Sequence, residues 1–143
     1  MIVFAVRRPL PLWTNPPLLA WALLGVVAAG IAFCWWARVH LGALWSAEVT
    51  RKEAHRVVES GPYGIVRHPI YTGFIVMYAG LVLLSASAVG LAGFVLMTVG
   101  LSLKARLEEE FLTGELGAAA YGDYKARTPM LVPRVTGRRL GPV

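Results

Sequence analysis

Two long stretches of this chain contain no charged side chain, residues 9–37 and residues 69–103. A helix that crosses the apolar core of a bilayer needs about 20 apolar residues, so the first stretch suffices for one crossing. The second suffices for two short or tilted crossings. The charged content of 15% and the hydrophobic content of 57% do not suit a soluble domain of this length. We predict an all-α integral membrane protein with about three transmembrane helices, an N-terminal helix followed by a helical hairpin.

Prolines, aromatic residues and small polar residues mark the ends of these helices. A retained helix is expected over residues 17–38, because proline suits a first helical turn and an aromatic pair before Arg38 is typical of a membrane interface. The arms of the hairpin are expected over residues 69–84 and 89–103. The second arm should continue past the membrane, since no helix breaker precedes Gly114.

The charges outside the apolar stretches predict the topology. The net charge is +6, and only Arg7 and Arg8 of the basic residues precede the first predicted helix. The positive-inside bias places the N-terminus outside, residues 39–67 in a cytoplasmic amphipathic segment and residues 104–143 in a cytoplasmic tail. The expected partners are membrane lipids with anionic head groups. Nucleic acid is not expected, because no binding module is recognisable in the single domain, residues 1–143.

Several kinds of site are not indicated. Cys34 is the only cysteine and lies in the first apolar stretch, which predicts a buried structural thiol. No metal site is expected, because His40, His55 and His68 lack the cysteine partners and the close spacing of a zinc site. No Ser-His-Asp, dinucleotide-binding or phosphate-loop pattern occurs.

Arg67, His68 and Pro69 mark the start of the hairpin. The residue before a proline avoids the helical region, and proline often begins a helix, so His68 should lie near the N-cap. The free backbone N–H groups from Ile70 onward would attract a carboxylate or phosphate, and Arg67 would add a positive charge. The alternative is a helix start at the membrane border with a snorkelling arginine.

A run of three acids, Glu108, Glu109 and Glu110, follows the second apolar arm. Such runs are commonly solvated faces, but this one should fold back toward the start of the first arm. A carboxylate there suits a cationic ligand or an arginine partner. Arg106 is close enough in sequence to orient an anionic substrate, or it pairs with Glu110.

The run HRVVESGPYGIVRHPIYTG, residues 55–73, resembles the signature of the isoprenylcysteine carboxyl methyltransferase family, and related phospholipid methyltransferases carry a similar one. The second half of the family pattern is a Glu-Glu-x-x-Leu, a Phe-Gly, a tyrosine pair and a closing proline. It is matched here by residues 108–112, Leu116-Gly117, Tyr121, Tyr124, Pro129 and Pro133. Either half alone is a weak signal, whereas the two together are specific.

The resemblance implies a membrane methyltransferase that uses S-adenosyl-L-methionine and releases S-adenosyl-L-homocysteine. The cofactor would lie at the cytoplasmic ends of the last helices under the C-terminal segment, and a lipophilic substrate would enter from the bilayer. The residues implied to bind the cofactor are His55, Tyr63, Arg67, His68, Pro69, Tyr71, Gly73, Glu109, Tyr121 and Tyr124. Arg106 and Glu108 are the catalytic candidates nearest the reacting group.

Three features depart from the family pattern. The chain has fewer spans than longer members, so its substrate tunnel either differs or is completed by a second subunit, for example in a dimer. One extra residue separates Gly117 from Tyr121. The basic residue that precedes the paired glutamates corresponds to either Lys104 or Arg106.

The acceptor determines which groups the chemistry needs. Methyl transfer from a sulfonium depends on alignment and on exclusion of water. A carboxylate acceptor, which we favour, or a thiolate needs only a cation such as Arg106 or Lys104. An amine, as in a phospholipid, must lose a proton to a base such as Glu108 or His68. A non-enzymatic membrane subunit is the alternative from another class, and a transporter is disfavoured because the apolar stretches hold no ionisable acid or base of a pathway.

Overall fold

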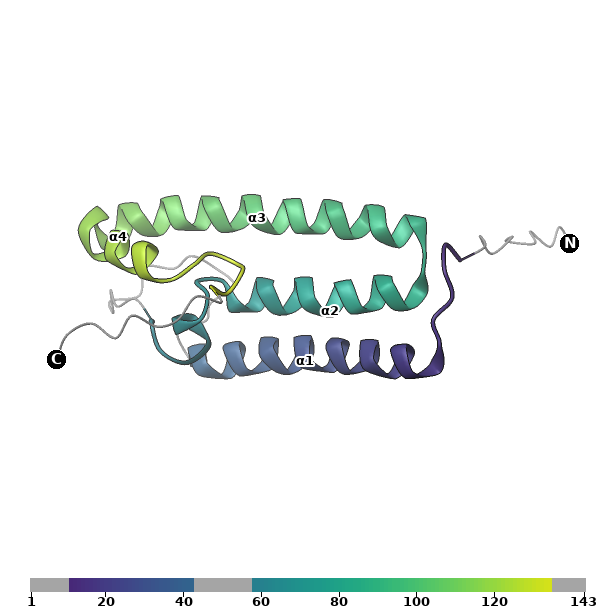
Figure 1. The fold of residues 1–143 in the computed structure, drawn as a ribbon. Helices are drawn as coiled ribbons and strands as arrows, with labels where there is room; N and C mark the ends of the chain where they lie inside the picture. Colours follow the sequence, from purple (N-terminus) through teal and green to yellow (C-terminus); the bar gives the residue numbers. More distant parts are fainter. Residues whose placement is uncertain (1–10, 43–57, 135–143) are drawn as a thin grey trace, which may run out of the picture.

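The computed structural model describes residues 11–42 and 58–134 (Figure 1). In these ranges the chain forms four α-helices and one 3-10 turn, namely α1 (Pro17–Leu41), η2 (Gly61–Gly64), α2 (Pro69–Ser85), α3 (Ala88–Leu116) and α4 (Ala118–Arg127). No strand occurs in these described ranges, so the prediction of an all-α fold is confirmed for them. His55 and most of the predicted amphipathic segment lie outside the described residues.

The ends of the helices differ modestly from the predicted ones. α1 continues past Arg38 to Leu41. The hairpin turn contains Ala86, whose left-handed φ of 51° ends α2, and Ser87, whose side chain accepts a hydrogen bond from the Gly90 N–H and caps α3. As predicted, α3 continues beyond its apolar part without a break, and it passes Gly114 before it ends at Leu116.

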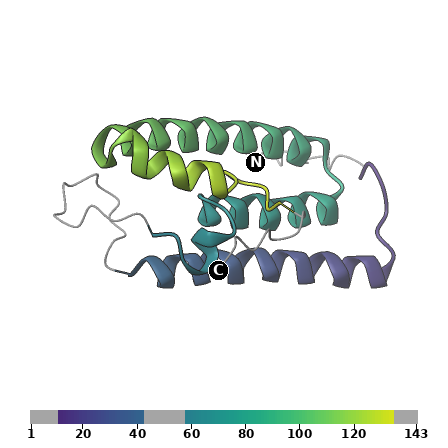
Figure 2. The ribbon, with the colours of Figure 1, turned by 60° about the vertical axis from the view of Figure 1, so that its left-hand side comes forward.

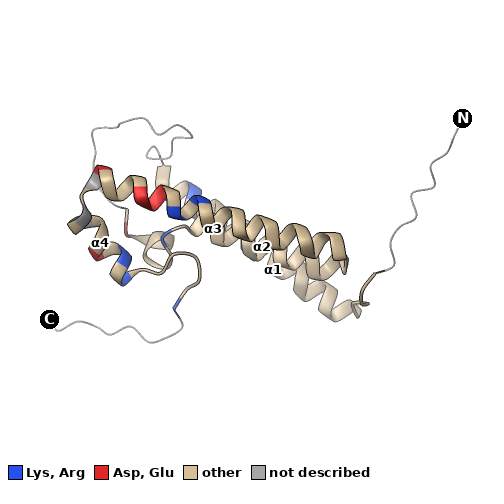
Figure 3. Cartoon of the chain, turned by 90° about the horizontal axis from the view of Figure 1, so that it is seen from above, with Lys and Arg blue, Asp and Glu red and all other residues tan. Residues whose placement is uncertain are grey.

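The three long helices lie in a row with α2 in the middle (Figures 1 and 2). α4 turns back beside the end of α3, and the segment after α4 approaches the start of α2 (Figure 2). Seen from above, the charged residues of the described ranges are confined to one end of the row, and the remainder is uncharged (Figure 3). The fold therefore brings the polar residues of distant segments together at one end of an apolar scaffold.

Small residues let α1 and α2 approach closely. A Cβ atom at Gly30 would lie 2.6 Å from the backbone nitrogen of Met77, and a Cβ at Gly80 would lie 2.9 Å from Val27 Cγ2. The Cys34 thiol donates to the Ile70 carbonyl at 3.3 Å. Small residues at such crossings are typical of helices that associate in a membrane.

The contact between α2 and α3 involves larger side chains. Tyr78 of α2 stacks on Phe94 of α3 with ring centroids 6.2 Å apart. Many apolar side chains of the outer helices remain exposed, as expected of surfaces that face lipid, including Trp21, Ile31, Trp35, Val95, Leu96 and Val99.

Two described helices are long and apolar enough to cross a bilayer, Pro17–Leu41 and Ala88–Glu115. The middle helix α2 is apolar but has 17 residues. At 1.5 Å per residue it is about 25 Å long, shorter than the apolar core of about 30 Å. The three-span topology, and the tilt or thinning that a short α2 requires, therefore stay predictions.

Replacement of Gly30 by alanine tests the close packing of α1 on α2. The added methyl group would collide with the backbone of α2, so we expect a loss of about 1–3 kcal/mol of stability and a lower Tm in detergent. Gly25→Ala is the matched control in the same helix, because nothing lies within 4 Å of a Cβ there. Equal melting temperatures for the two variants would contradict the packing described.

Candidate functional site

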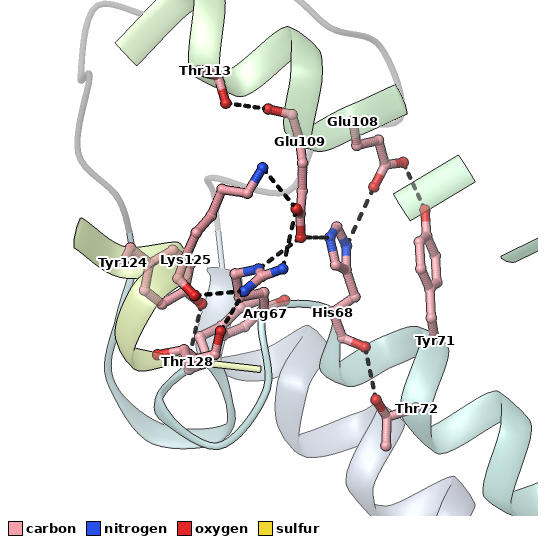
Figure 4. A network of polar contacts seen from close by, with 11 residues as sticks. Arg67, His68, Tyr71, Thr72, Glu108, Glu109, Thr113, Tyr124, Lys125 and Thr128 are labelled. Atoms are coloured by element: carbon pink, nitrogen blue, oxygen red, sulfur yellow. Dashed lines mark hydrogen bonds and ion pairs between the residues drawn. The ribbon is translucent and has the colours of Figure 1, made fainter. Parts of the chain in front are cut away.

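The polar residues at the charged end form one network (Figure 4). They come from the residues that precede α2, from the first turn of α2, from the charged extension of α3 and from α4 with the segment that follows it. Pro69 is fully buried and starts α2, and this places Arg67 and His68 directly before the helix. Glu108 and Glu109 are brought opposite them because α3 continues as a helix beyond its apolar part.

The centre of the network is a buried ion pair between Arg67 and Glu109. Arg67 Nε donates to Glu109 Oε1 at 2.7 Å, and Nη2 donates to Oε2 at 3.1 Å. The Glu109 residue is only 4% exposed. Burial alone would raise the pKa of Glu109, but the hydrogen bonds and the charge of Arg67, helped by Lys125, hold that pKa below its usual value. This paired geometry fixes both groups in one orientation.

Arg67 also holds the end of α4 and the segment that follows it. Its Nη1 donates to the carbonyls of Lys125, at 3.0 Å, and of Thr128. The backbone N–H groups of Arg67 and His68 donate to the carbonyls of Pro129 and Met130, at 2.9 and 3.1 Å. Together with the two bonds to Glu109, these contacts engage four of the five guanidinium N–H groups of Arg67.

Two more contacts fasten α4 and the segment that follows it. Thr72 donates its hydroxyl to the Leu131 carbonyl at 2.7 Å. The Lys125 ammonium lies 3.3 Å from Glu109 Oε2, so Glu109 pairs with a cation on each side. Residues 128–131 therefore lie along the start of α2.

His68 lies between the two glutamates. Its Nε2 is 3.2 Å from Glu109 Oε1, and its Nδ1 is 3.6 Å from Glu108 Oε2. Its ring stacks on Tyr71 with centroids 5.4 Å apart and an interplanar angle of 4°. The pKa of the His68 imidazole is below its usual value, first because burial disfavours the charged ring, although both glutamates act in the opposite direction.

A second group of contacts lies nearer the apolar part of the helices. The Tyr71 hydroxyl donates to Glu108 Oε1 at 2.6 Å. The Lys104 ammonium lies 3.9 Å from the same oxygen and 5.6 Å from the centre of the Tyr71 ring. This corner combines a carboxylate, a phenol and a cation where α2 and α3 leave their apolar stretches.

Three tyrosines pack together behind the network. The buried Tyr124 donates its hydroxyl to the backbone carbonyl of Tyr63 at 2.7 Å, and its ring meets Tyr121 edge-on at 5.9 Å. Burial raises the pKa values of Tyr63 and Tyr121 to about 12. These phenols are therefore protonated at neutral pH, and they join α4 to the η2 turn.

The structure brings most of the predicted site residues together. Those in the network or directly beside it are Tyr63, Arg67, His68, Pro69, Tyr71, Glu108, Glu109, Tyr121 and Tyr124. Gly73 instead faces α1, where an added Cβ would collide with Cys34 Sγ. Arg106 is exposed, and no polar contact to it occurs among the described residues. In the same ranges no cluster of His, Cys, Asp or Glu is arranged to hold a metal ion.

Sequence reasoning missed Lys125, Thr128 and Thr72. A basic residue directly after Tyr124, in a segment expected to cover an acidic run, was a usable signal for Lys125. Thr72 is a polar residue at the start of an apolar helix. Thr128 offers only its backbone carbonyl to Arg67, and no side-chain pattern could have indicated that contact.

Comparison with known proteins gives one family. The model of the isoprenylcysteine carboxyl methyltransferase (ICMT) family matches residues 22–113, more than half of the chain. Methanethiol S-methyltransferase 2 of Bradyrhizobium diazoefficiens is 34% identical, over 97% of this chain and 57% of its own length. A cobalt-zinc-cadmium resistance protein of Cupriavidus metallidurans is 30% identical, over 87% and 53%. Protein-S-isoprenylcysteine O-methyltransferase B of Arabidopsis thaliana is 27% identical, over 62% and 45%.

The chain spans about half the length of the curated relatives it matches. No solved structure gave a significant match.

Replacement of Glu109 by glutamine tests the buried ion pair. Arg67 would keep its charge in a buried place without a compensating carboxylate, and loss of one partner of such a pair costs about 3 kcal/mol. We expect a clearly lower Tm in detergent and faster proteolysis near residue 128. Glu110→Gln, an exposed neighbour on the same helix, should change stability by less than about 0.5 kcal/mol. Similar losses in both variants would show that the pair does not hold this end together.

The lowered pKa of His68 predicts how stability depends on pH. The unfolded chain takes up a proton on this histidine at about pH 6.5, whereas the folded chain does so at lower pH. Between those values the unfolded state binds more protons, so stability falls as the pH drops below about 6.5. Melting curves between about pH 5 and pH 7.5 should show this loss in the wild type and a flatter dependence in His68→Gln. Identical slopes would refute the assignment.

Proposed function

This chain belongs to the isoprenylcysteine carboxyl methyltransferase family, and from that premise we propose that it is an S-adenosyl-L-methionine-dependent methyltransferase of the membrane. Its proposed acceptor is a lipophilic molecule that arrives from the bilayer, with a carboxylate favoured as the reacting group. The observation that carries the proposal is the network of Arg67, His68, Tyr71, Glu108 and Glu109 beneath the covering segment 128–131. The proposed reaction takes place at the cytoplasmic face, with the N-terminus outside.

The chemistry of the described residues fits the cofactor. S-adenosyl-L-methionine carries a carboxylate, an ammonium group, ribose hydroxyls, a sulfonium and an adenine ring. The N-terminus of α2 has no side-chain cap, so its N–H groups suit the carboxylate. Glu108 and Glu109 suit the ammonium or the hydroxyls. The rings of Tyr71 and Tyr121 suit adenine or the sulfonium through stacking and cation–π contact.

When bound, the cofactor supplies a methyl group made electrophilic by the sulfonium. The contribution of the protein is then to align the acceptor and to exclude water. Arg67 contributes indirectly, because it holds Glu109 and the covering segment in place. His68 is neutral at neutral pH because of its lowered pKa, so only one of its ring nitrogens carries a hydrogen that it can donate to Glu108 or Glu109.

The relatives support an acceptor that reacts as an anion. The name of the Bradyrhizobium relative specifies a thiol as its substrate, and that of the Arabidopsis relative specifies isoprenylcysteine. A thiolate and a carboxylate both react without a general base. A phospholipid amine is the alternative within the family. A second copy of the chain that completes the substrate passage is part of the proposal.

Calorimetric titration of S-adenosyl-L-methionine into purified protein in detergent tests the proposal. The wild type should bind, and His68→Ala should bind at least about tenfold more weakly, which corresponds to a loss of about 1.4 kcal/mol. Glu110→Gln serves as the control, since Glu110 is exposed on the same end of α3. Absence of binding to the wild type would favour a non-enzymatic membrane subunit. Unchanged affinity in His68→Ala would show that the cofactor binds elsewhere.

A further inference from the structure

We propose that the turn between α2 and α3 lies inside the hydrocarbon of the bilayer, and that Trp13 and Asn15 make this possible by capping the end of α2. The partner of this end of the molecule is then lipid acyl chains and not water. Three observations support this placement, namely the length of the hairpin arms, the hydrogen bonds of the turn and the side chains around it. The placement is independent of the proposed methyl transfer.

Both arms of the hairpin are shorter than the apolar core of a bilayer. At 1.5 Å per residue the 17 residues of α2 are about 25 Å long, and the uncharged part of α3, Ala88 to Leu103, is about 24 Å long. The hydrocarbon core is about 30 Å thick. With Arg67 and Lys104 held at one membrane surface, the turn would lie about 5 Å below the other surface. Thinning of the bilayer is needed only if the turn must reach water.

The segment 11–16 passes beside the turn and caps the end of α2 (Figures 1 and 2). The last carbonyls of a helix have no partner within it, and in hydrocarbon no water replaces that partner. The Trp13 indole N–H donates to the Leu83 carbonyl at 2.9 Å. The Asn15 side-chain amide donates to the same carbonyl at 3.0 Å and to that of Leu84 at 2.9 Å. Both carbonyls are therefore satisfied by side chains that precede α1.

Other backbone groups of the turn are paired within the protein as well. The Val82 carbonyl accepts from the Ala86 N–H at 3.0 Å and from the Ser85 hydroxyl at 3.1 Å. The Ala86 carbonyl accepts from the Leu12 N–H at 2.8 Å. On the other arm, the Ser87 side chain caps α3. A turn with these partners does not depend on water for its hydrogen bonds.

The side chains around the turn suit contact with acyl chains. Residues 9–37 and 69–103 contain no charge, so neither the turn nor the segment that caps it is charged. Leu18 and Val89 are 84% and 77% exposed at this end. Pro16 and Pro17, at the start of α1, have no N–H group that needs a partner. Contact of such a surface with acyl chains is favourable, whereas contact with water is not.

Replacement of Asn15 by leucine in bilayers of different thickness tests the proposal. The carbonyls of Leu83 and Leu84 would each lose a donor. In dimyristoleoylphosphatidylcholine, a thin bilayer, water can reach these carbonyls, whereas in dierucoylphosphatidylcholine, a thick one, it cannot. We expect Asn15→Leu to lower the Tm, measured by circular dichroism in vesicles, by at least about 4 °C more in the thick bilayer than in the thin one.

Thr14→Val is the matched control, because Thr14 is exposed in the same segment and its replacement also exchanges a polar for an apolar side chain. Its Tm relative to the wild type should change little between the two bilayers. Trp13→Phe should show the effect of thickness in a weaker form, since Asn15 still donates to Leu83. A loss in Asn15→Leu that is equal in both bilayers would overturn the proposal, because water would then reach the turn in each of them.

Thiol labelling locates the turn directly. Ala88 is exposed at the turn, and Ala126 is exposed on α4 at the charged end. In a Cys34→Ala background, Ala88→Cys and Ala126→Cys are treated with a membrane-impermeant maleimide on both faces of the vesicles. The reactive thiolate forms in water and not in hydrocarbon, so Ala88→Cys should react at least about tenfold more slowly than Ala126→Cys in the thick bilayer.

The same labelling in the thin bilayer distinguishes lipid from other partners. If acyl chains cover the turn, Ala88→Cys should react faster in the thin bilayer than in the thick one. Equal rates for Ala88→Cys and Ala126→Cys in the thick bilayer would place the turn in water. Equally slow labelling of Ala88→Cys in both bilayers would mean that protein, such as a second copy of the chain, covers the turn. Either of these two results overturns the proposal.

Discussion

The buried ion pair between Arg67 and Glu109 is the interaction on which the polar end of this molecule depends. It joins the start of α2 to the extension of α3, and through the carbonyls of Lys125 and Thr128 it joins both to α4 and to the segment 128–131. Buried charges are stable only when they are paired and hydrogen-bonded. Each partner therefore requires the other, and the segment 128–131 is held as a consequence.

The apolar part of the fold serves as the scaffold for this network. Glycines let α1 and α2 pack against each other at backbone distance, which fixes the place where Pro69 begins α2. The contact of α2 with α3 includes the stacked rings of Tyr78 and Phe94, and it ends at the corner formed by Tyr71, Glu108 and Lys104. A lipophilic acceptor proposed to arrive along these helices would meet its first cation at that corner. The apolar part of such a molecule would then lie along the uncharged helices, and its polar part would lie at the charged end of the structure.

Much of this arrangement is readable from the sequence, because a helical hairpin has a simple geometry. Residues equally far from its turn lie opposite one another, so the acidic run had to come near Arg67 and His68 once the turn at residues 85–88 was recognised. The rotation of α3 about its own axis is not readable in this way. It decides whether Lys104 or Arg106 faces α2, and it depends on packing that no short motif encodes. Gly73 shows a related limit. A glycine in a signature can make room for a ligand or for a neighbouring helix, and this glycine makes room for Cys34 of α1.

The most direct measurement of the central claim is a crystal structure of the protein with S-adenosyl-L-homocysteine bound. The account predicts density for this molecule between the start of α2, Glu109 and the segment 128–131, with the Arg67–Glu109 pair intact. Density in another part of the molecule, or a bound state in which the segment 128–131 has left α2 and the pair is broken, would contradict it.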